Sequence, residues 1–141
     1  MSKIGFDMDG VLVPDYNAIP NLVEEEFYLQ TLYAKPLINP MGEFDVVTAR
    51  FDDPVVRRIT EQWCLQLHTA PKNIFMRPRR DGGHESPAEF KYRVSMEHGY
   101  TTYIESDINV VNEMISLNIA NRTDLDVVHF DSFVSNCFKI S

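Results

Sequence analysis

The sequence predicts an α/β protein with a Rossmann-like, three-layer fold built on a mainly parallel sheet of about five strands. Two observations support this prediction. Five short runs of β-branched and aromatic residues recur along the chain, and such runs are typical of buried strands. Helical patterns separate the last four runs at about 25 to 30 residues per unit, a spacing typical of βαβ crossovers and a parallel sheet.

Most of the expected strands end at polar or charged residues. The five expected strands are 4–6, 44–47, 73–76, 102–104 and 126–130. Asp7, Thr48 and Glu105 directly follow the first, second and fourth of them, and an arginine cluster follows the third. Ligands of open α/β sheets bind beyond the carboxyl ends of the strands, so these side chains are the first candidates for a site.

Three helices carry start signals. Asp53 is a predicted N-cap followed by a proline, and one apolar face then repeats at Val56, Ile59, Trp63 and Leu67. Residues 86–89 form a capping box that opens a helix to about His98, with Gly99 as its C-terminal cap. A third helix begins at Asp107 or Ile108 and places Val111, Met114 and Ile115 on one face.

The first connection differs from the others. It runs from Gly10 to Gly42, contains four prolines and predicts one helix from Asn21 to about Tyr33. We interpret residues 11–42 as a small insert or flap over the sheet, within a single domain of residues 1–141.

Composition excludes several classes of protein. The chain has 141 residues, 44% hydrophobic and 24% charged, with no apolar run near the ~20 residues of a membrane helix and no signal-peptide stretch. We therefore expect a cytoplasmic protein without membrane partners. A net charge of −8 disfavours extended nucleic-acid binding. Cys64 and Cys137 have no zinc or disulfide spacing, and we expect them to be reduced thiols.

The candidate residues suit phosphate-ester chemistry. Asp7 can attack phosphorus as a nucleophile, and Asp9 can act as a general acid and base. Thr48 can donate a hydrogen bond to a phosphoryl oxygen, and Lys91 can hold both Asp7 and the phosphate. Two adjacent acids also offer oxygens to Mg²⁺. The simpler alternatives are a turn or calcium-loop fragment at Asp7 and Asp9, a strand-end hydroxyl at Thr48 and a solvated lysine at Lys91.

Several arginines lie near these positions. Arg50 and Arg77 are candidate substrate-binding residues, although Arg50 can equally cap a helix or form a surface ion pair. The arginines at 77, 79 and 80 can bind a second phosphate or form an ordinary solvated loop. Of the four histidines, His84 is the one that lies near the expected site in the sequence.

Four segments resemble the motifs of the haloacid dehalogenase superfamily, in the correct order and over almost the whole chain. The segment 6–11 (FDMDGV) is similar to its first motif, 46–50 (VVTAR) to the second, Lys91 to the third and 105–107 (ESD) to the fourth, acidic motif. The resemblance implies an aspartyl-phosphate intermediate on Asp7 and a Mg²⁺ held by Asp7, the backbone carbonyl of Asp9 and an acid of the fourth motif. The second acid of the first motif is typical of the phosphatases of this superfamily and favours them over its dehalogenases.

The fourth motif departs from the usual pattern. Its Glu-Ser-Asp sequence places Ser106 where a direct metal ligand often stands. Glu105 and Asp107 are the two candidate acids for the metal site, and the sequence leaves the choice open. Asp107 can equally be the N-cap of its helix.

Further resemblances bear on the substrate. The segment 75–78 (FMRP) with Asp81 and Lys91 is similar to the phosphatase module of polynucleotide kinases, and 7–12 (DMDGVL) resembles deoxyribonucleotidases. Both imply a nucleotide or a nucleic-acid terminal phosphate as substrate. The sequence also allows a phosphate-binding or regulatory module with little turnover, and a phosphotransferase.

Overall fold

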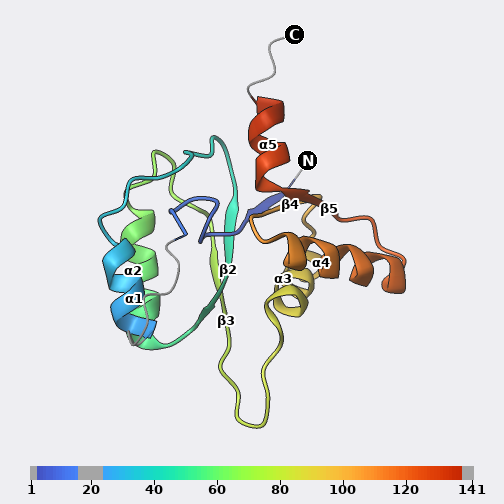
Figure 1. Cartoon of the computed structure of the whole chain (residues 1–141), viewed down its shortest axis with the longest axis horizontal. Coiled ribbons are helices and arrows are strands. Elements are labelled where there is room, and N and C mark those ends of the chain that lie inside the picture. The colour runs from blue at the N-terminus through green and yellow to red at the C-terminus, as the bar shows by residue number, and fades with distance from the viewer. Residues whose placement is uncertain (1–2, 16–23, 138–141) are drawn as a thin grey trace.

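The computed structural model describes residues 3–15 and 24–137. A five-stranded parallel sheet in the order β3-β2-β1-β4-β5 forms its centre, and helices lie on both faces (Figure 1). This confirms the expected α/β class and three-layer architecture. In chain order the elements are β1 (Ile4–Phe6), α1 (Glu24–Thr31), β2 (Asp45–Phe51), α2 (Pro54–Cys64), β3 (Ile74–Arg77), α3 (Pro87–Glu97), β4 (Thr102–Glu105), α4 (Ile108–Asn121), β5 (Asp126–His129) and α5 (Phe130–Cys137).

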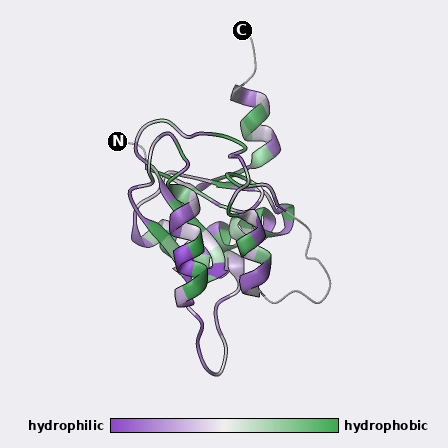
Figure 2. Ribbon diagram, turned by 90° about the vertical axis from the view of Figure 1, so that its left-hand side faces the viewer, coloured by the Kyte–Doolittle hydropathy of each residue, from purple (hydrophilic) through white to green (hydrophobic). Residues whose placement is uncertain are grey.

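Two hydrophobic cores lie on opposite faces of the sheet. In β2, Val46 packs into the core that contains Trp63 of α2, whereas Val47 packs into the core that contains Phe90 of α3 and Met114 of α4. Adjacent strand residues point to opposite faces, so one short strand contributes to both cores. The helices carry both apolar and polar bands along their length, as expected for helices that cover a sheet (Figure 2).

The described part of the insert shares the first core. Leu32 is buried with Trp63, whose indole N–H donates to the Ala34 carbonyl at 2.9 Å. Helix α1 lies beside α2 (Figure 1). It is shorter than the expected 21–33, because it ends at Thr31, and positions 21–23 lie outside the described residues. None of the described helices is long and apolar enough to cross a membrane.

The structure differs from expectation at several element ends: β3 is shifted by one residue and ends at Arg77, and β4 includes Glu105. Strand β2 continues past Thr48 to Phe51. The expected last strand stops one residue early, at His129, and Phe130 begins helix α5, which we did not predict. Asp53 holds the N-cap position of α2, but its carboxylate accepts no capping hydrogen bond and instead pairs with Arg79 at 2.9 Å.

The start of α3 matches the prediction. Ser86 Oγ accepts a hydrogen bond from the Glu89 N–H at 3.1 Å, and the Glu89 carboxylate accepts one from the Ser86 N–H at 3.1 Å. Pro87 occupies the first turn, where its missing N–H costs nothing. This reciprocal cap fixes the beginning of the helix that carries Lys91.

We expect Ser86→Ala to lower the free energy of unfolding by about 1 kcal/mol, because the Glu89 N–H loses its partner. Urea unfolding followed by circular dichroism measures the change. Ser116→Ala, on the exposed face of α4, is the matched control and should stay within about 0.5 kcal/mol of the unmodified protein. An equal effect of both substitutions would contradict the capping role.

Candidate active site

A pocket of about 240 Å³ opens at the carboxyl ends of β1, β2 and β4. We call it the strand-end pocket. All eight residues that the sequence suggested for catalysis, substrate or metal binding line it: Asp7, Asp9, Thr48, Arg50, Arg77, Lys91, Glu105 and Asp107. The site therefore lies where parallel α/β sheets bind their ligands.

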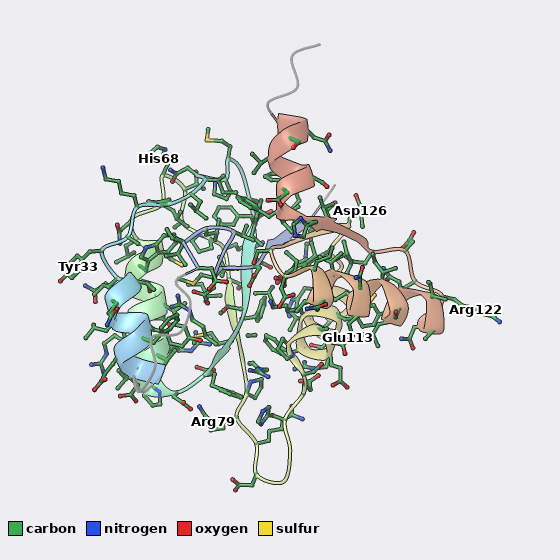
Figure 3. All side chains as sticks on the ribbon, in the orientation of Figure 1. Tyr33, His68, Arg79, Glu113, Arg122 and Asp126 are labelled. Atoms are coloured by element: carbon green, nitrogen blue, oxygen red, sulfur yellow. The ribbon has the colours of Figure 1, made fainter. Side chains whose placement is uncertain are left out.

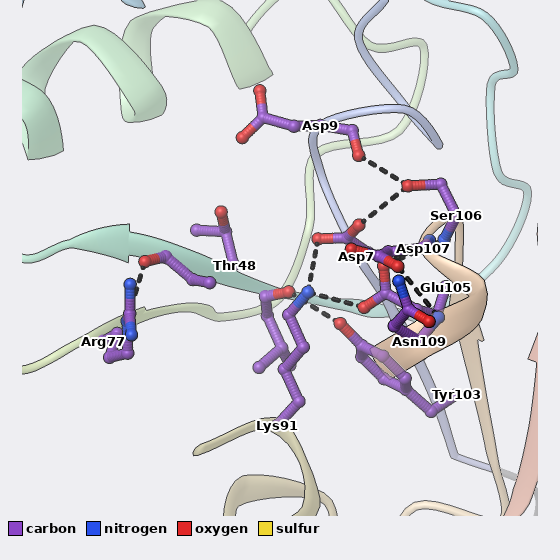
Figure 4. A network of polar contacts seen from close by, with 12 residues as sticks. Asp7, Asp9, Thr48, Arg77, Lys91, Tyr103, Glu105, Ser106, Asp107 and Asn109 are labelled. Carbon is purple, nitrogen blue, oxygen red and sulfur yellow. Dashed lines mark hydrogen bonds and ion pairs between the residues drawn. The ribbon is translucent and has the colours of Figure 1, made fainter. Parts of the chain in front are cut away.

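Asp7, Lys91 and Glu105 form a buried ionic triad at the floor of this pocket (Figure 4). Lys91 Nζ donates to Asp7 Oδ1 at 3.1 Å and to Glu105 Oε1 at 2.5 Å. The Asp7 N–H donates to the Ile104 carbonyl at 2.9 Å, so the backbone of Asp7 is still held against β4. Each charged group thus comes from a rigid element: the end of β1, helix α3 or the end of β4.

Two carboxylates share one ammonium group in this triad. Burial raises the pKa of Asp7 well above its ordinary value, and the nearby Glu105 adds to this, while Lys91 opposes it. Burial disfavours the charged form of Lys91, but Asp7 and Glu105 outweigh it and raise the pKa of Lys91. An additional cation beside Asp7 would therefore stabilise its charged form.

Glu105 is already fully engaged. Its Oε1 accepts from Lys91, and its Oε2 accepts from the backbone N–H groups of Ser106 at 2.9 Å and Asp107 at 3.1 Å. These contacts favour a role in holding Lys91 and the start of α4 over the metal-ligand role that the sequence left open.

Asp107 is the N-cap of α4. Its Oδ1 accepts from the Asn109 N–H at 2.9 Å, and the residue is exposed at the edge of the pocket. The capping alternative from the sequence is thus observed. Both acids of the fourth motif thus already have partners within the protein, and the residue between them is a further candidate metal ligand.

Ser106 occupies the position between the two acids of the first motif. Its Oγ lies 3.0 Å from the Asp9 carbonyl oxygen and 3.4 Å from Asp7 Oδ2 (Figure 4). Gly10 permits this approach, because a Cβ at that position would lie 2.5 Å from Ser106 Oγ. Gly10 also has a φ of +86°, which favours glycine.

These three oxygens fit a hard divalent cation. Among residues 3–15 and 24–137, no three His, Cys, Asp or Glu side chains are arranged to hold a metal ion. The ligand set instead mixes a carboxylate, a carbonyl and a hydroxyl, and Mg²⁺ often keeps several waters besides one or two carboxylates. Adjacent ligands of octahedral Mg²⁺ lie about 2.9 Å apart, which is close to the 3.0 Å between Ser106 Oγ and the Asp9 carbonyl oxygen and shorter than the 3.4 Å between Ser106 Oγ and Asp7 Oδ2.

Thr48 lies inside β2 rather than at its end, which corrects the sequence interpretation. Beyond Thr48 the pairing with β3 shifts: β2 advances from Thr48 to Phe51 while β3 advances only from Met76 to Arg77. Such bulges redirect side chains near functional sites. Thr48 is buried, lines the pocket and accepts from the Arg50 N–H at 3.2 Å, so its hydroxyl proton can be donated to a ligand.

Arg77 stabilises this bulge through hydrogen bonds to the backbone. Its Nε donates to the Ala49 carbonyl at 3.0 Å, its Nη1 donates to the Glu85 carbonyl at 3.0 Å, and its guanidinium lies 4.2 Å from the centre of the Phe51 ring. It lines the pocket, as a substrate-binding residue should, but it also joins β2 to the loop before α3.

Arg50 lines the pocket, and its guanidinium forms an ion pair with a neighbouring carboxylate. It is fully buried, and it donates to both carboxylate oxygens of Asp9, at 2.9 and 2.7 Å. Asp9 itself remains 25% exposed in its side chain. Asp9, which we expect to transfer protons, is therefore fixed by Arg50 on its buried side.

Tyr28 and Asp15 also line the pocket, and neither was selected from the sequence. Tyr28 of α1 lies with its ring 4.2 Å from the Arg50 guanidinium, and Asp15 follows the loop after β1. Partial burial raises the pKa of Asp15, and the carboxylates of Asp9, Asp107 and Glu105 add to the shift. Both residues lie in the segment that we interpreted as an insert, where no motif distinguishes them.

The remaining arginines and the histidine lie beside the pocket. Arg79 is on the loop between β3 and α3, 4.0 Å from the centre of the Phe51 ring (Figure 3). The ring of His84 meets Phe51 edge-on at 4.7 Å. Arg80 is exposed on the same loop.

Taken as chemistry, the site offers a buried carboxylate for attack, a lysine beside it, a hydroxyl donor and a second carboxylate open to the pocket. This set can neutralise and position a phosphoryl group. Comparison of the chain with protein-family models, with curated proteins and with solved structures finds no match.

Proposed function

We propose that the chain is a phosphomonoesterase that uses Asp7 as its nucleophile. The observation that carries the proposal is a buried carboxylate at the end of the central strand β1, 3.1 Å from a buried lysine and open to a 240 Å³ pocket. A surface turn or a calcium loop would need no such lysine. Covalent catalysis needs an aimed carboxylate with its charge balanced nearby, and this arrangement supplies both.

The reaction would proceed in two steps. Asp7 attacks phosphorus, the bond from phosphorus to the leaving oxygen breaks, and Asp9 gives that oxygen a proton. Water then attacks the aspartyl-phosphate, Asp9 takes a proton from it, and inorganic phosphate leaves with Asp7 restored. Lys91 and Thr48 would hold phosphoryl oxygens during both steps.

Asp7, the Asp9 carbonyl and Ser106 would hold the Mg²⁺. The ion would supply positive charge against the carboxylates and the phosphate dianion. Without added charge, a triad of two carboxylates and one ammonium group would repel a dianionic substrate.

A nucleotide or nucleic-acid end is the substrate class that we propose. Tyr28 lines the pocket, and the loop that carries Arg79 and Arg80 follows Arg77, which also lines it. An aromatic ring can stack on a base, and arginines can contact further phosphates.

Purified protein with Mg²⁺ should release phosphate from a chromogenic ester and, faster, from nucleotides or 3′-phosphorylated oligonucleotides. Removal of the metal with EDTA should stop release, and added Mg²⁺ should restore it. No turnover over a broad panel of phosphate esters would contradict the proposal.

A second candidate is a phosphate-binding module with little turnover, and Ser106 is the observation that favours it. A hydroxyl group in place of a carboxylate leaves the metal site with one negative charge less. Beryllofluoride, which mimics an aspartyl-phosphate, would bind to Asp7 in either case, so turnover separates the two candidates.

Ser106→Asp should bind Mg²⁺ at least about tenfold more tightly than the unmodified protein, because it adds a charged oxygen ligand. Isothermal titration calorimetry with Mg²⁺ alone measures this without any substrate. Ser116→Asp, on the exposed face of α4, adds the same charge away from the pocket and should leave the affinity unchanged. Equal affinity of Ser106→Asp and unmodified protein would place the metal elsewhere.

A further inference from the structure

The guanidinium of Arg50 is the meeting point of four segments of the chain. Its Nε and Nη2 donate to the two Asp9 carboxylate oxygens, and its Nη1 donates to Thr60 Oγ1 of α2 at 3.0 Å. Its Nη2 also lies 3.5 Å from Thr31 Oγ1 of α1, and the Tyr28 ring covers it at 4.2 Å. All three guanidinium nitrogens are therefore committed to partners within the protein.

The other partner of this ion pair, Asp9, lines the strand-end pocket. The loop after β1 holds Asp9 through backbone hydrogen bonds, including Gly10 N–H to the Val13 carbonyl at 2.8 Å. The Asp9 carbonyl faces Ser106, while its carboxylate points away from Asp7 (Figure 4). The direction of that carboxylate is set by Arg50, because both of its oxygens accept from the same planar guanidinium.

Stability alone does not account for this arrangement. A buried ion pair is weak evidence for stabilisation, since the desolvation of the charges offsets their attraction. Here the arginine is buried but the carboxylate is 25% exposed, and the exposed part opens to the pocket. A planar, bidentate contact fixes the angle of a carboxylate as well as its position, which a proton-transfer group requires.

We propose that Arg50 is a positioning residue that aligns the Asp9 carboxylate, and that Tyr28 makes this alignment depend on helix α1. The inference rests on the proposed phosphatase activity, because Asp9 needs alignment only if it moves a proton. Tyr28 contacts Arg50 and also lines the pocket. A leaving group that packs against Tyr28 would therefore act on the same contact that orients the acid.

This role differs measurably from direct substrate binding. A residue that binds substrate in the ground state and the transition state alike raises KM when it is removed, whereas a residue that acts through Asp9 lowers kcat. Misplacement of a catalytic group by about 1 Å can cost on the order of 10² in rate. We expect Arg50→Lys to lower kcat by on the order of 10² with KM changed by less than about threefold, because lysine lacks the planar fork.

Three measurements on the full chain test the proposal. Steady-state kinetics with a chromogenic phosphate ester compare Arg50→Lys, Arg50→Ala and Tyr28→Leu with unmodified protein, and free guanidinium is added to Arg50→Ala. Guanidinium should restore part of the lost kcat. Tyr28→Leu should lower kcat by about three- to tenfold, a smaller change because the Asp9 hydrogen bonds remain. Arg57→Gln, which removes an arginine from a surface pair with Asp52, is the matched control.

The effect must pass through Asp9. The double variant Arg50→Lys with Asp9→Ala should have the same kcat as Asp9→Ala alone, because the aligned group is already gone. A merely structural role would instead lower kcat further in the double variant. A rise in KM at unchanged kcat, or full activity of Arg50→Lys, would also overturn the inference.

The ion pair itself can be observed without turnover. In ¹⁵N NMR spectra, the Arg50 Nε–H should exchange slowly with water, and Asp9→Ala should abolish this protection while Arg57→Gln leaves it intact. Fast exchange in the unmodified protein would refute the pairing.

Two kinds of failure can be told apart. If the unmodified protein hydrolyses no phosphate ester, the proposed function fails. If the unmodified protein is active and Arg50→Lys is equally active, only the positioning role fails. Arg50→Lys also serves if Arg50→Ala does not fold.

Discussion

Asp7→Asn should lower kcat by at least about 10³-fold while the protein stays folded, because an amide cannot form the aspartyl-phosphate intermediate. The asparagine oxygen can still accept from Lys91 at the Oδ1 position, but the amide nitrogen then takes the Oδ2 position and donates to Ser106 Oγ instead of accepting from it. Burial and the nearby Glu105 raise the pKa of Asp7. The substitution removes the charge of Asp7, so the folded state loses a repulsive contact with Glu105. Steady-state phosphate release and thermal unfolding measure the two effects separately.

Asp124→Asn is the matched control for this substitution. Asp124 is exposed in the turn between α4 and β5, far along the chain from the strand-end pocket, and its amide form should have unchanged kcat. Trapping of the intermediate by acid quench and mass spectrometry should find phosphate on Asp7 in the unmodified protein and in Asp124→Asn, and no phosphate at position 7 in Asp7→Asn. If Asp7→Asn kept more than a tenth of the activity, Asp7 would not be the nucleophile.

The positions of the strands and of the pocket could be predicted because they depend on local patterns. Buried strands of a parallel sheet are short apolar runs, and Asp7 and Glu105 follow such runs directly. The capping box at Ser86 was equally local, because both of its partners lie within four residues. At these positions the signal spans one turn or one strand, and sequence and structure agree; the cap at Asp53 and the end of the last strand are local signals that the structure does not follow.

Differences appear where tertiary contacts decide. The extension of β2 beyond Thr48 depends on the shifted pairing with β3 and on Arg77, neither of which is visible in the segment itself. Helix α5 begins at Phe130 with no loop after β5, and the apolar run that predicts the strand continues into this residue. A pattern that reads as one longer strand is therefore divided by the packing of Phe133 against Phe6 in the first core.

The roles within the site were the least visible in the sequence. Glu105 and Ser106 are adjacent, and the turn from β4 into α4 directs Glu105 to the Lys91 side of Asp7 and Ser106 to the side of the Asp9 carbonyl. The partner of Arg50 lies 41 residues earlier, at Asp9, so no spacing in the sequence connects them. Residue types thus identified which groups belong to the site, and the geometry distinguished those that face the ligand from those that hold them.

Lys91→Met should lower the free energy of unfolding by about 3 to 5 kcal/mol at pH 8, because it leaves Asp7 and Glu105 buried without a cation. Methionine keeps the length of the side chain, so the lost contact is mainly electrostatic. Urea unfolding followed by circular dichroism measures the change. Lys72→Met is the matched control, since its pair with Glu43 is exposed to solvent and its loss should leave the free energy of unfolding almost unchanged.

The pH dependence of this loss identifies its cause. Asp7 has a raised pKa in the folded protein, and removal of Lys91, which opposes that rise, should raise it further. The folded state of the variant then binds protons that the unfolded state has released, so its stability falls as pH rises above the ordinary carboxyl pKa of about 4. The deficit relative to unmodified protein should therefore shrink between pH 8 and pH 5. In the unmodified protein the stabilisation from Lys91 is present at neutral pH and should disappear only as pH rises above about 10.4.

Adding Glu105→Gln to Lys91→Met should recover part of the loss at pH 8, because one of the two uncompensated carboxylates is then neutral. A deficit that is independent of pH, and unchanged by Glu105→Gln, would instead indicate a packing defect, and would leave Lys91 without the charge-balancing role that the phosphatase proposal requires.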